Sequence, residues 1–243
     1  MGRPDEPALT PDEAKDALRE FSREQRLVYE DAGYKWDDAT KDEAAFRFYA
    51  SETYLGPLTA AAFSGWCFRN VKIQTKDGRL VPFDLNPMQF RFCEKVFDDL
   101  QKLKPIRYVI LKARQFGFST LIQVLCFFFT AIRPNTSATV ISHKGDSTNH
   151  LFEISKRVHR NLKWKPRLKR SNAKGLMWDD PWDSKVMLET AEGQEAGRST
   201  TNSIIHASEI AFWKNAQKTW LALSQTVGDF AGTMVFQEST ANG

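Results

Sequence analysis

The sequence predicts an α/β protein whose central sheet is mostly parallel and is flanked by helices. Apolar, largely β-branched runs of strand length recur along the chain, at residues 108–112, 138–142, 185–189, 203–209 and 234–237. Helical patterns lie between several of these runs, at residues 121–132, 146–162 and 216–227. Since a strand–helix–strand unit with this spacing closes through a right-handed crossover, the strands are expected to lie parallel.

The composition is that of a globular protein without a membrane segment. Its 243 residues suffice for one large or two small domains, and an apolar fraction of 42% can fill a sizeable core. Cys67, Cys93 and Cys126 form no C-x-x-C pair, which excludes a typical zinc site and suits a reducing cytosol. The longest apolar run, residues 121–132, is too short to span a bilayer, and no signal segment is predicted.

Residues 1–83 are expected to form an N-terminal helical extension and a β-hairpin, followed by a second domain at 84–243. Thr10-Pro11-Asp12-Glu13 is a capping box with proline at the first helical position, so a helix should begin at Pro11. Further patterns predict short helices at 44–49 and 58–63 and a hairpin of strands 71–75 and 80–83.

Charge is distributed unevenly along the chain. Residues 1–60 carry 8 basic and 14 acidic side chains, whereas residues 61–243 carry 26 basic and 16 acidic ones. The larger part therefore has the sign that attracts a polyanion, although a merely soluble basic protein would show the same balance.

A basic run at residues 156–174 holds nine basic residues and no acidic one. We expect it to contact DNA phosphates, with Arg167, Lys169 and Arg170 as representative contacts, because no acid in the run itself can pair with it. A solvated basic face is the alternative.

The stretch from Arg107 to Thr120 combines a strand, expected to be buried, a tight turn and the start of a long apolar helix. In this context backbone N–H groups and a helix N-terminus can bind phosphate. On the pattern G-x-x-x-x-G-K-[ST], Gly117 is the second glycine and Ser119 supplies the hydroxyl for Mg²⁺. The first glycine and the lysine are replaced, by Lys112 and Phe118.

The basic residue of this loop is expected to be either Lys112 or Arg114, at the front of the turn. An ordinary strand–turn–helix connection is the alternative to a phosphate loop. Gln89 lies in the first turn of a helix that begins at Pro87, where its amide can read an adenine edge or simply be solvated.

Two further polar groups follow predicted strands, Ser208-Glu209 and Ser239-Thr240. Ligands of open α/β sheets bind at the carboxyl ends of strands, so both groups are expected beside the loop. Together with Gln89 and the loop, they resemble the ATPase part of the large terminase subunit, the DNA-packaging motor of tailed bacteriophages. The resemblance covers roughly residues 84–243, and the irregular loop of that family, A-R-Q-x-G-x-S, is matched at residues 113–119.

The resemblance implies a RecA-like P-loop NTPase fold of the ASCE type that hydrolyses ATP, with ATP and Mg²⁺ as cofactors. Glu209 would be the catalytic glutamate. ATP would be bound by the adenine-contacting residue and the whole loop, namely Gln89, Lys112, Ala113, Arg114, Gln115, Phe116, Gly117, Phe118, Ser119 and Thr120. Mg²⁺ would be held at Ser119 and, through water, at Ser208. Nucleotide state would be coupled to movement by Ser239, Thr240 and Ala241.

Arg198 stands about eleven residues before Glu209, where the family has an arginine finger. Its loop contains Gly193 and Gly197, which favours action on a neighbouring subunit. A surface arginine paired with a nearby glutamate is the alternative.

The chain departs from the family at Ser208, where an aspartate usually helps to hold Mg²⁺, so a less acidic metal shell is expected. The nuclease domain of the family is expected to be missing, and nuclease activity with it. The implied partners are double-stranded DNA, the portal protein, the small terminase subunit and further copies of the chain in a ring, with a monomer in isolation, in the cytoplasm of the infected bacterium. A helicase-like DNA translocase and a DNA-binding module with an inactive loop are the alternatives.

Overall fold

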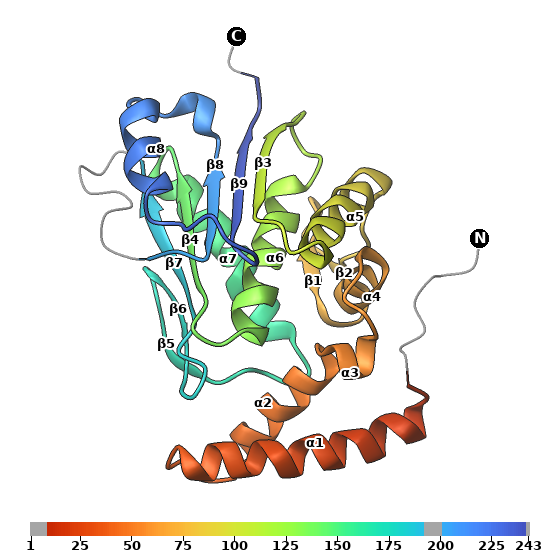
Figure 1. The fold of residues 1–243 in the computed structure, drawn as a ribbon. Helices are drawn as coiled ribbons and strands as arrows, with labels where there is room; N and C mark the ends of the chain where they lie inside the picture. The colour runs from red at the N-terminus through yellow and green to blue at the C-terminus, as the bar shows by residue number, and fades with distance from the viewer. Residues whose placement is uncertain (1–8, 192–200, 242–243) are drawn as a thin grey trace.

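The computed structural model describes residues 9–191 and 201–241, which form a seven-stranded sheet with helices on both faces (Figure 1). In hydrogen-bonded order, its strands are β3 (Ile106–Leu111), β9 (Met234–Ser239), β8 (Ile204–Ser208), β4 (Ser137–Ser142), β7 (Lys185–Thr190), β6 (Gly175–Trp178) and β5 (Leu168–Asn172). The first five strands are parallel, and β6 and β5 are antiparallel to their neighbours. The predicted α/β fold with a mostly parallel sheet is confirmed.

Alternate residues of the central strands point into two cores, one on each side of the sheet. In β8, for example, Ile204 belongs to the larger core and Ile205 to the smaller one. The larger core is covered by α5 (Pro87–Gln101), α6 (Phe118–Ile132) and α7 (Gly145–Asn161). Residues of η1 (Ile210–Phe212) and α8 (Ala216–Ser224) close the smaller one.

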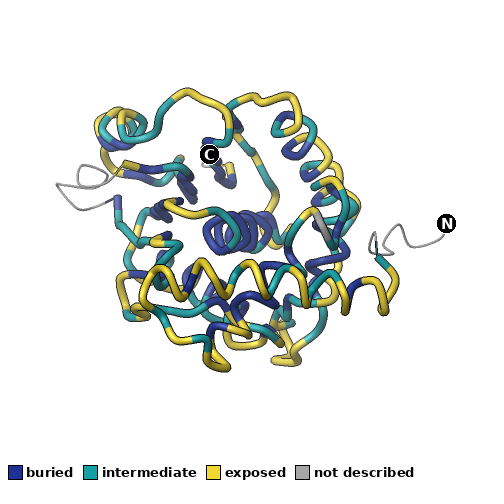
Figure 2. The backbone as a smooth tube through the Cα atoms, turned by 60° about the horizontal axis from the view of Figure 1, so that its bottom comes forward, coloured by how far each residue is buried: buried dark blue, intermediate teal, exposed yellow. Residues whose placement is uncertain are grey.

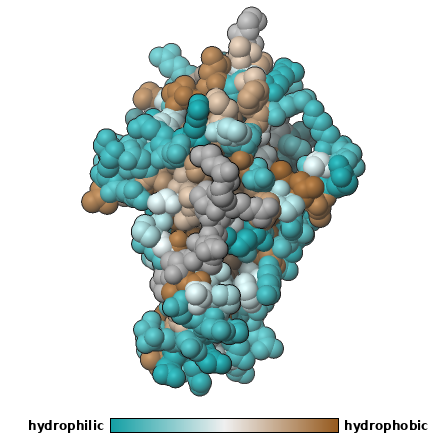
Figure 3. Space-filling model, turned by 90° about the vertical axis from the view of Figure 1, so that its right-hand side faces the viewer, coloured by the Kyte–Doolittle hydropathy of each residue, from teal (hydrophilic) through white to brown (hydrophobic). Residues whose placement is uncertain are grey.

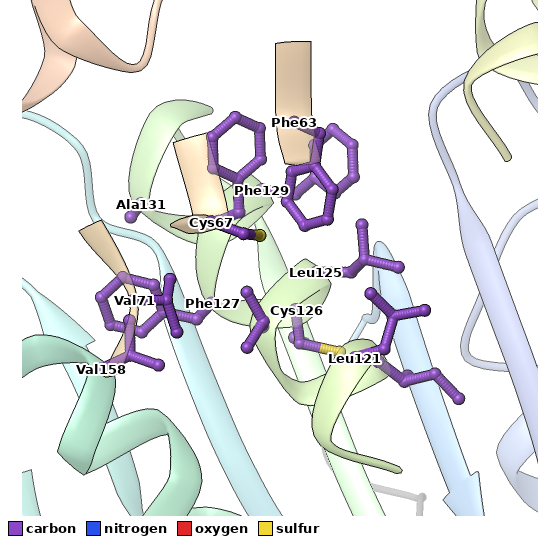
Figure 4. Packing of buried hydrophobic residues seen from close by; sticks show 14 of the residues in the cluster. Phe63, Cys67, Val71, Leu121, Leu125, Cys126, Phe127, Phe129, Ala131 and Val158 are labelled. Carbon is purple, nitrogen blue, oxygen red and sulfur yellow. The ribbon is translucent and has the colours of Figure 1, made fainter. Parts of the chain in front are cut away.

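Helix α6 lies at the centre of the larger core. It is apolar on almost every side and buried along nearly its whole length, as the sequence predicts, and Figure 2 shows it as the dark blue helix seen almost end-on at the middle. The cluster drawn in Figure 4 joins its Leu121, Leu125 and Phe129 to Phe63 and Cys67 of α4 (Ala60–Asn70). Each large apolar side chain buried in this way contributes about 1.5–3 kcal/mol to folding.

Helices α1 (Pro11–Asp31), α2 (Asp38–Tyr49) and α3 (Glu52–Leu55) lie below the amino ends of the parallel strands in Figure 1. The predicted capping box is present, because Thr10 and Glu13 each accept from the other's backbone N–H. Helix α2 begins earlier than predicted, because the Asp37 side chain caps it by accepting from the Thr40 N–H at 3.0 Å.

The N-terminal helices share buried polar contacts with the rest of the chain. Arg47 of α2 is buried, pairs with Glu43 and donates to the carbonyl of Ala131 near the end of α6. The predicted hairpin is also present, as β1 (Lys72–Gln74) antiparallel to β2 (Leu80–Pro82). Among the described residues, no helix is both long and apolar enough to cross a membrane.

One sequence prediction about strands was wrong, and a strand in the basic run was not predicted. The strand before the loop was expected to be buried, but β3 is an edge strand, and Val109 and Leu111 are each 78% exposed. Figure 3 views the molecule from the side that carries α4 and α5, and it shows apolar, brown residues on the surface near the top. The basic run was given no strand, yet part of it forms β5, which pairs with β6; its exposed polar residues lack the apolar alternation of a predictable strand.

Candidate functional site

The predicted phosphate loop connects the end of β3 to the first turn of α6. Gly117 is the N-cap of α6 and has a φ of +71°, in the left-handed region that favours glycine. A Cβ there would lie 2.8 Å from Nε2 of Gln89. The loop therefore requires glycine at this position for its backbone conformation and for the close approach of Gln89.

Gln89 is buried and hydrogen-bonds to the loop, so its amide is not open to a ligand. Its Nε2 donates to the carbonyl of Gly117 at 2.9 Å, its Oε1 accepts from the Asn86 N–H at 3.0 Å, and the residue is only 3% exposed. Its predicted contact with adenine stays a prediction, and in this conformation the amide already fixes the turn.

Phe118 stands where the usual phosphate loop has lysine, and its side chain belongs to the core. It is 8% exposed and packs edge-on against Phe92 of α5, with ring centroids 5.5 Å apart. This position therefore cannot present a charge to a ligand, and the positive charge has to come from elsewhere in the loop. The amides of the first turn of α6 still face outward from a helix N-terminus, where an anion is favoured.

The two candidate basic residues differ in their surroundings. Lys112 is nearly buried, and its Nζ lies 3.1 Å from Oε1 of Glu209 and 3.5 Å from Oε2 of Glu238. Arg114 is exposed and lines the pocket beside the loop, and within the described parts of the chain it makes no hydrogen bond or ion pair. Arg114 is thus the available cation, whereas Lys112 neutralises two carboxylates.

Glu209 follows β8 in a left-handed conformation, with φ of 53°, and its carboxylate is held from two sides. Oε2 accepts from both the backbone N–H and the hydroxyl of Thr240 at 3.1 Å, and Oε1 pairs with Lys112. Burial raises the pKa of Glu209, but the hydrogen bonds from Thr240 and the charge of Lys112 outweigh it and hold the pKa below its usual value. The group is therefore an ionised acceptor at neutral pH.

Two of the three predicted coupling residues, Ser239 and Thr240, contact Glu209 directly. Besides Thr240, Ser239 brings its hydroxyl to 3.5 Å from Oε2 of Glu209, and Ser239 also accepts from the Ala211 N–H at 3.3 Å. Ala241 follows them and is exposed. A shift of the end of β9 would consequently change the position of the Glu209 carboxylate.

Glu238 is a site residue that the sequence did not single out. It is fully buried on β9 and accepts at Oε1 from Nε2 of His206 at 3.0 Å and from the Ser208 hydroxyl at 2.9 Å. Burial raises its pKa, but the hydrogen bond and charge of His206, the charge of Lys112 and a hydrogen bond from Ser119 lower it to about 2. The predicted metal residue Ser208 thus acts on a neighbouring carboxylate.

The surroundings of Ser119 fit a hard cation such as Mg²⁺. Oε2 of Glu238 is a buried oxygen without a hydrogen-bond partner, and oxygen donors are the ligands that Mg²⁺ prefers. Within the described residues, no group of three His, Cys, Asp or Glu side chains could enclose a metal. Phosphate and water oxygens would have to complete its shell, as is usual for Mg²⁺ at nucleotide sites.

A pocket of about 340 Å³ opens beside the loop. Its lining joins predicted residues to two that the sequence did not indicate, His143 and Phe212, and consists of Lys112, Arg114, Gln115, His143, Glu209, Phe212 and Thr240. The structure thus brings the loop, Glu209 at the end of β8 and the coupling residue Thr240 together. Arg198 lies outside the described residues.

The basic run is more strongly paired than its sequence suggested. Arg167 forms an ion pair of 2.6 Å with Asp179, and Lys169 lies 3.5 Å from Asp180. The run itself contains no acid, but the segment after β6 supplies the acids that pair with these two residues. Arg170 remains exposed on β5, and the contact of the run with DNA stays a prediction.

The order of strands defines the class of fold. One strand, β9, lies between the strand that leads into the loop and the strand that leads into Glu209, as in RecA-like P-loop NTPases. A comparison with solved structures supports this fold. The large terminase of bacteriophage HK97 is similar with a TM-score of 0.59 and 15% identity, over 72% of this chain and 36% of that chain.

A second similar structure is the large terminase ATPase domain of Thermus phage P74-26, with a TM-score of 0.44 and 17% identity, over 61% of this chain and 69% of that one. No family model matches the chain, and the comparison with curated proteins found no match. The shared fold is therefore established by the HK97 structure, of which this chain spans about a third.

Proposed function

We propose that this chain is an ATPase of the DNA-packaging type, which hydrolyses ATP to drive double-stranded viral DNA into a procapsid. One observation supports it above all. The ionised carboxylate of Glu209 lies at the pocket formed by the glycine-containing loop, 3.1 Å from the loop's own Lys112. A loop that binds phosphate beside a fixed acceptor for water is the arrangement that ATP hydrolysis requires.

Each group then has a definite task. The N–H groups at the start of α6 and the guanidinium of Arg114 bind the β- and γ-phosphates, and the hydroxyl of Ser119 lies next to them. Glu209, oriented by Thr240, accepts a proton from the attacking water or orients it. Mg²⁺, when bound near Ser119 and Ser208, neutralises charge on the phosphate oxygens.

Nucleotide binding is the first test of this proposal. If the chain binds ATP, a concentration a hundred times its Kd stabilises the fold by about 2.7 kcal/mol, which a thermal-shift assay detects. A chain that shows no stabilisation by ATP or ADP would instead be a DNA-binding module with an inactive loop.

Arg114→Ala is expected to weaken ATP binding by about 10- to 100-fold, because hydrogen bonds to a charged group contribute about 1.5–3 kcal/mol. Calorimetric titration with ATP measures the change. Arg91→Ala is the matched control, since Arg91 is an exposed arginine on α5. Lys112→Met should mainly lower stability and turnover, because it leaves Glu209 and Glu238 without their cation. A larger loss of affinity in Lys112→Met than in Arg114→Ala would reverse the assignment.

The proposed DNA contact is tested best on the basic residues without acidic partners in the described part of the chain. Changing Lys165, Arg170 and Lys174 together to glutamine should weaken binding to all DNA sequences alike and reduce the salt slope by about 1 per lost phosphate contact. A control with equal charge loss, at Lys15, Arg19 and Lys41 of α1 and α2, should change neither quantity. Equal effects of the two triple variants would mean that DNA binding depends only on the net charge of the protein.

Arg198 is proposed to act on the ATP of a neighbouring copy of the chain in a ring. Arg198→Ala and Glu209→Gln proteins would each be inactive alone. Mixed under conditions that assemble rings, the first contributes an intact Glu209 and the second the missing arginine, so ATPase activity should return in part. An arginine finger contributes about 10³–10⁵ in rate, so even partial recovery is measurable. Assembled mixed rings without activity would place Arg198 outside catalysis.

The portal protein and a small terminase subunit are the protein partners that this function implies, in the cytoplasm of an infected bacterium. A helicase-like translocase would share the ATP site and differ in its requirement for these partners. Stimulation of the ATPase by a portal ring, measured beside stimulation by DNA alone, separates the two.

A further inference from the structure

We propose that Glu238 is the acidic residue of the metal site in this ATPase, and that it supplies from β9 the carboxylate that Ser208 lacks on β8. The inference rests on the proposed function, since it concerns how a metal–nucleotide complex is held. It assigns a task to a buried glutamate that neither the sequence pattern nor the water-activating role of Glu209 explains.

The sheet places Glu238 between the two halves of the site. Because β9 lies between β3 and β8, Glu238 is in register with Ile110 on one side and with Ser208 on the other. It therefore lies one strand nearer to the phosphate loop than Ser208 does. The side chain of Ser119, in the first turn of α6, lies near this carboxylate and helps to lower its pKa.

One oxygen of the Glu238 carboxylate has no hydrogen-bond partner. Oε1 accepts from His206 and Ser208, whereas Oε2 is buried without a hydrogen-bond partner, 3.5 Å from Nζ of Lys112. The ion pair with Lys112 offsets part of the cost of burying this charge, but a buried charge also needs hydrogen bonds. Glu238 itself does not line the pocket but lies behind Lys112, which does, so a metal-bound water can donate to its Oε2 where the Lys112 side chain moves aside.

A chain of buried hydrogen bonds fixes the orientation of this carboxylate. His206 Nε2 donates to Glu238, its Nδ1 lies 2.6 Å from Nε2 of Gln123, and Oε1 of Gln123 accepts from the Ser155 hydroxyl at 3.2 Å. All of these residues are fully buried. Outer partners that orient the groups around a metal are as important as the ligands, and losing one typically lowers metal affinity about 10- to 100-fold.

The simpler role for Glu238 is that of a counter-ion for Lys112 and a hydrogen-bond acceptor for His206 in the core. That role predicts a loss of stability on mutation and no specific loss of metal affinity. The experiment therefore has to measure metal binding apart from folding and turnover.

Mn²⁺ is the probe, titrated into the protein saturated with a non-hydrolysable ATP analogue and followed by electron paramagnetic resonance. Glu238→Gln is expected to weaken Mn²⁺ binding about 10- to 100-fold, while the affinity for the analogue in EDTA stays within about threefold. Glu94→Gln on the exposed face of α5 makes the same chemical change as a control and should leave both affinities unchanged.

A rescue variant separates a metal role from a structural one. The Ser208 hydroxyl lies 2.9 Å from the Glu238 carboxylate, so Ser208→Asp in the Glu238→Gln background returns a carboxylate to nearly the same place. Mn²⁺ affinity should recover at least tenfold. If Glu238→Gln does not fold, Glu238→Asp keeps the charge beside Lys112 but withdraws it by one methylene, and should show the same loss of Mn²⁺ affinity.

Mn²⁺ affinity within twofold of the wild type in the folded variant would overturn the proposal and leave Glu238 as a counter-ion. Failure of the wild-type chain to bind the analogue in EDTA would contradict the ATPase function itself. The two failures are distinguished because the metal-free titration is measured first.

Discussion

Replacing Glu209 by glutamine is expected to lower the rate of ATP hydrolysis by at least about a hundredfold and to leave ATP binding intact. Glutamine keeps the shape of the side chain and can still accept from Thr240, but it cannot accept a proton from water. Single-turnover hydrolysis measures the loss, and a thermal-shift titration with ATP measures binding.

The control for this variant is Glu94→Gln, which removes one exposed carboxylate from α5 and should change neither quantity. Turnover within tenfold of the wild type in Glu209→Gln would show that another group activates the water. Loss of ATP binding in this variant would mean that the Lys112–Glu209 pair holds the phosphate loop in shape.

Gly117→Ala is expected to weaken ATP binding about 10- to 100-fold. At a φ of +71° an alanine is strained by about 1–2 kcal/mol, and its Cβ would displace the Gln89 amide, 2.8 Å away. The loop can relieve this strain only by leaving the conformation in which Gln89 fixes the Gly117 carbonyl. Calorimetric titration with ATP measures the loss.

Gly33→Ala isolates the contribution of backbone strain. Gly33 follows α1 with a φ of +82°, and nothing lies within 4 Å of a Cβ built there. This variant should lose about 1–2 kcal/mol of stability and none of its ATP affinity. If both alanine variants bind ATP like the wild type, the conformation of Gly117 has no part in nucleotide binding.

The fold could be predicted where a local pattern decided the structure. The capping box at Thr10 and the all-apolar helix α6 depend on residues close together in the chain, and both are as predicted. The β-branched pattern of β3 was correctly read as a strand, but its exposure depends on which strand lies beside it. An edge strand and a central strand can carry similar residues, so Val109 and Leu111 were misplaced.

The site was predictable only in part for the same reason. Glu209 and Thr240 were expected near the loop because both follow strands, and the structure places them in contact. Glu238 was missed because its role comes from the insertion of β9 between β3 and β8, an order that the sequence does not reveal. The acids that pair with Arg167 and Lys169 were missed because they lie ten or more residues further along the chain.

The complete burial of α6 has a consequence for how the molecule opens. Amide hydrogen exchange reports local opening, and elements with the most buried contacts exchange only when the whole protein unfolds. Helix α6 belongs to that slowest group, whereas α1, with only Ala14 and Tyr29 buried, can fray on its own. Because the phosphate loop is attached to the slowest-exchanging helix, conditions that open α1 should leave the loop in place.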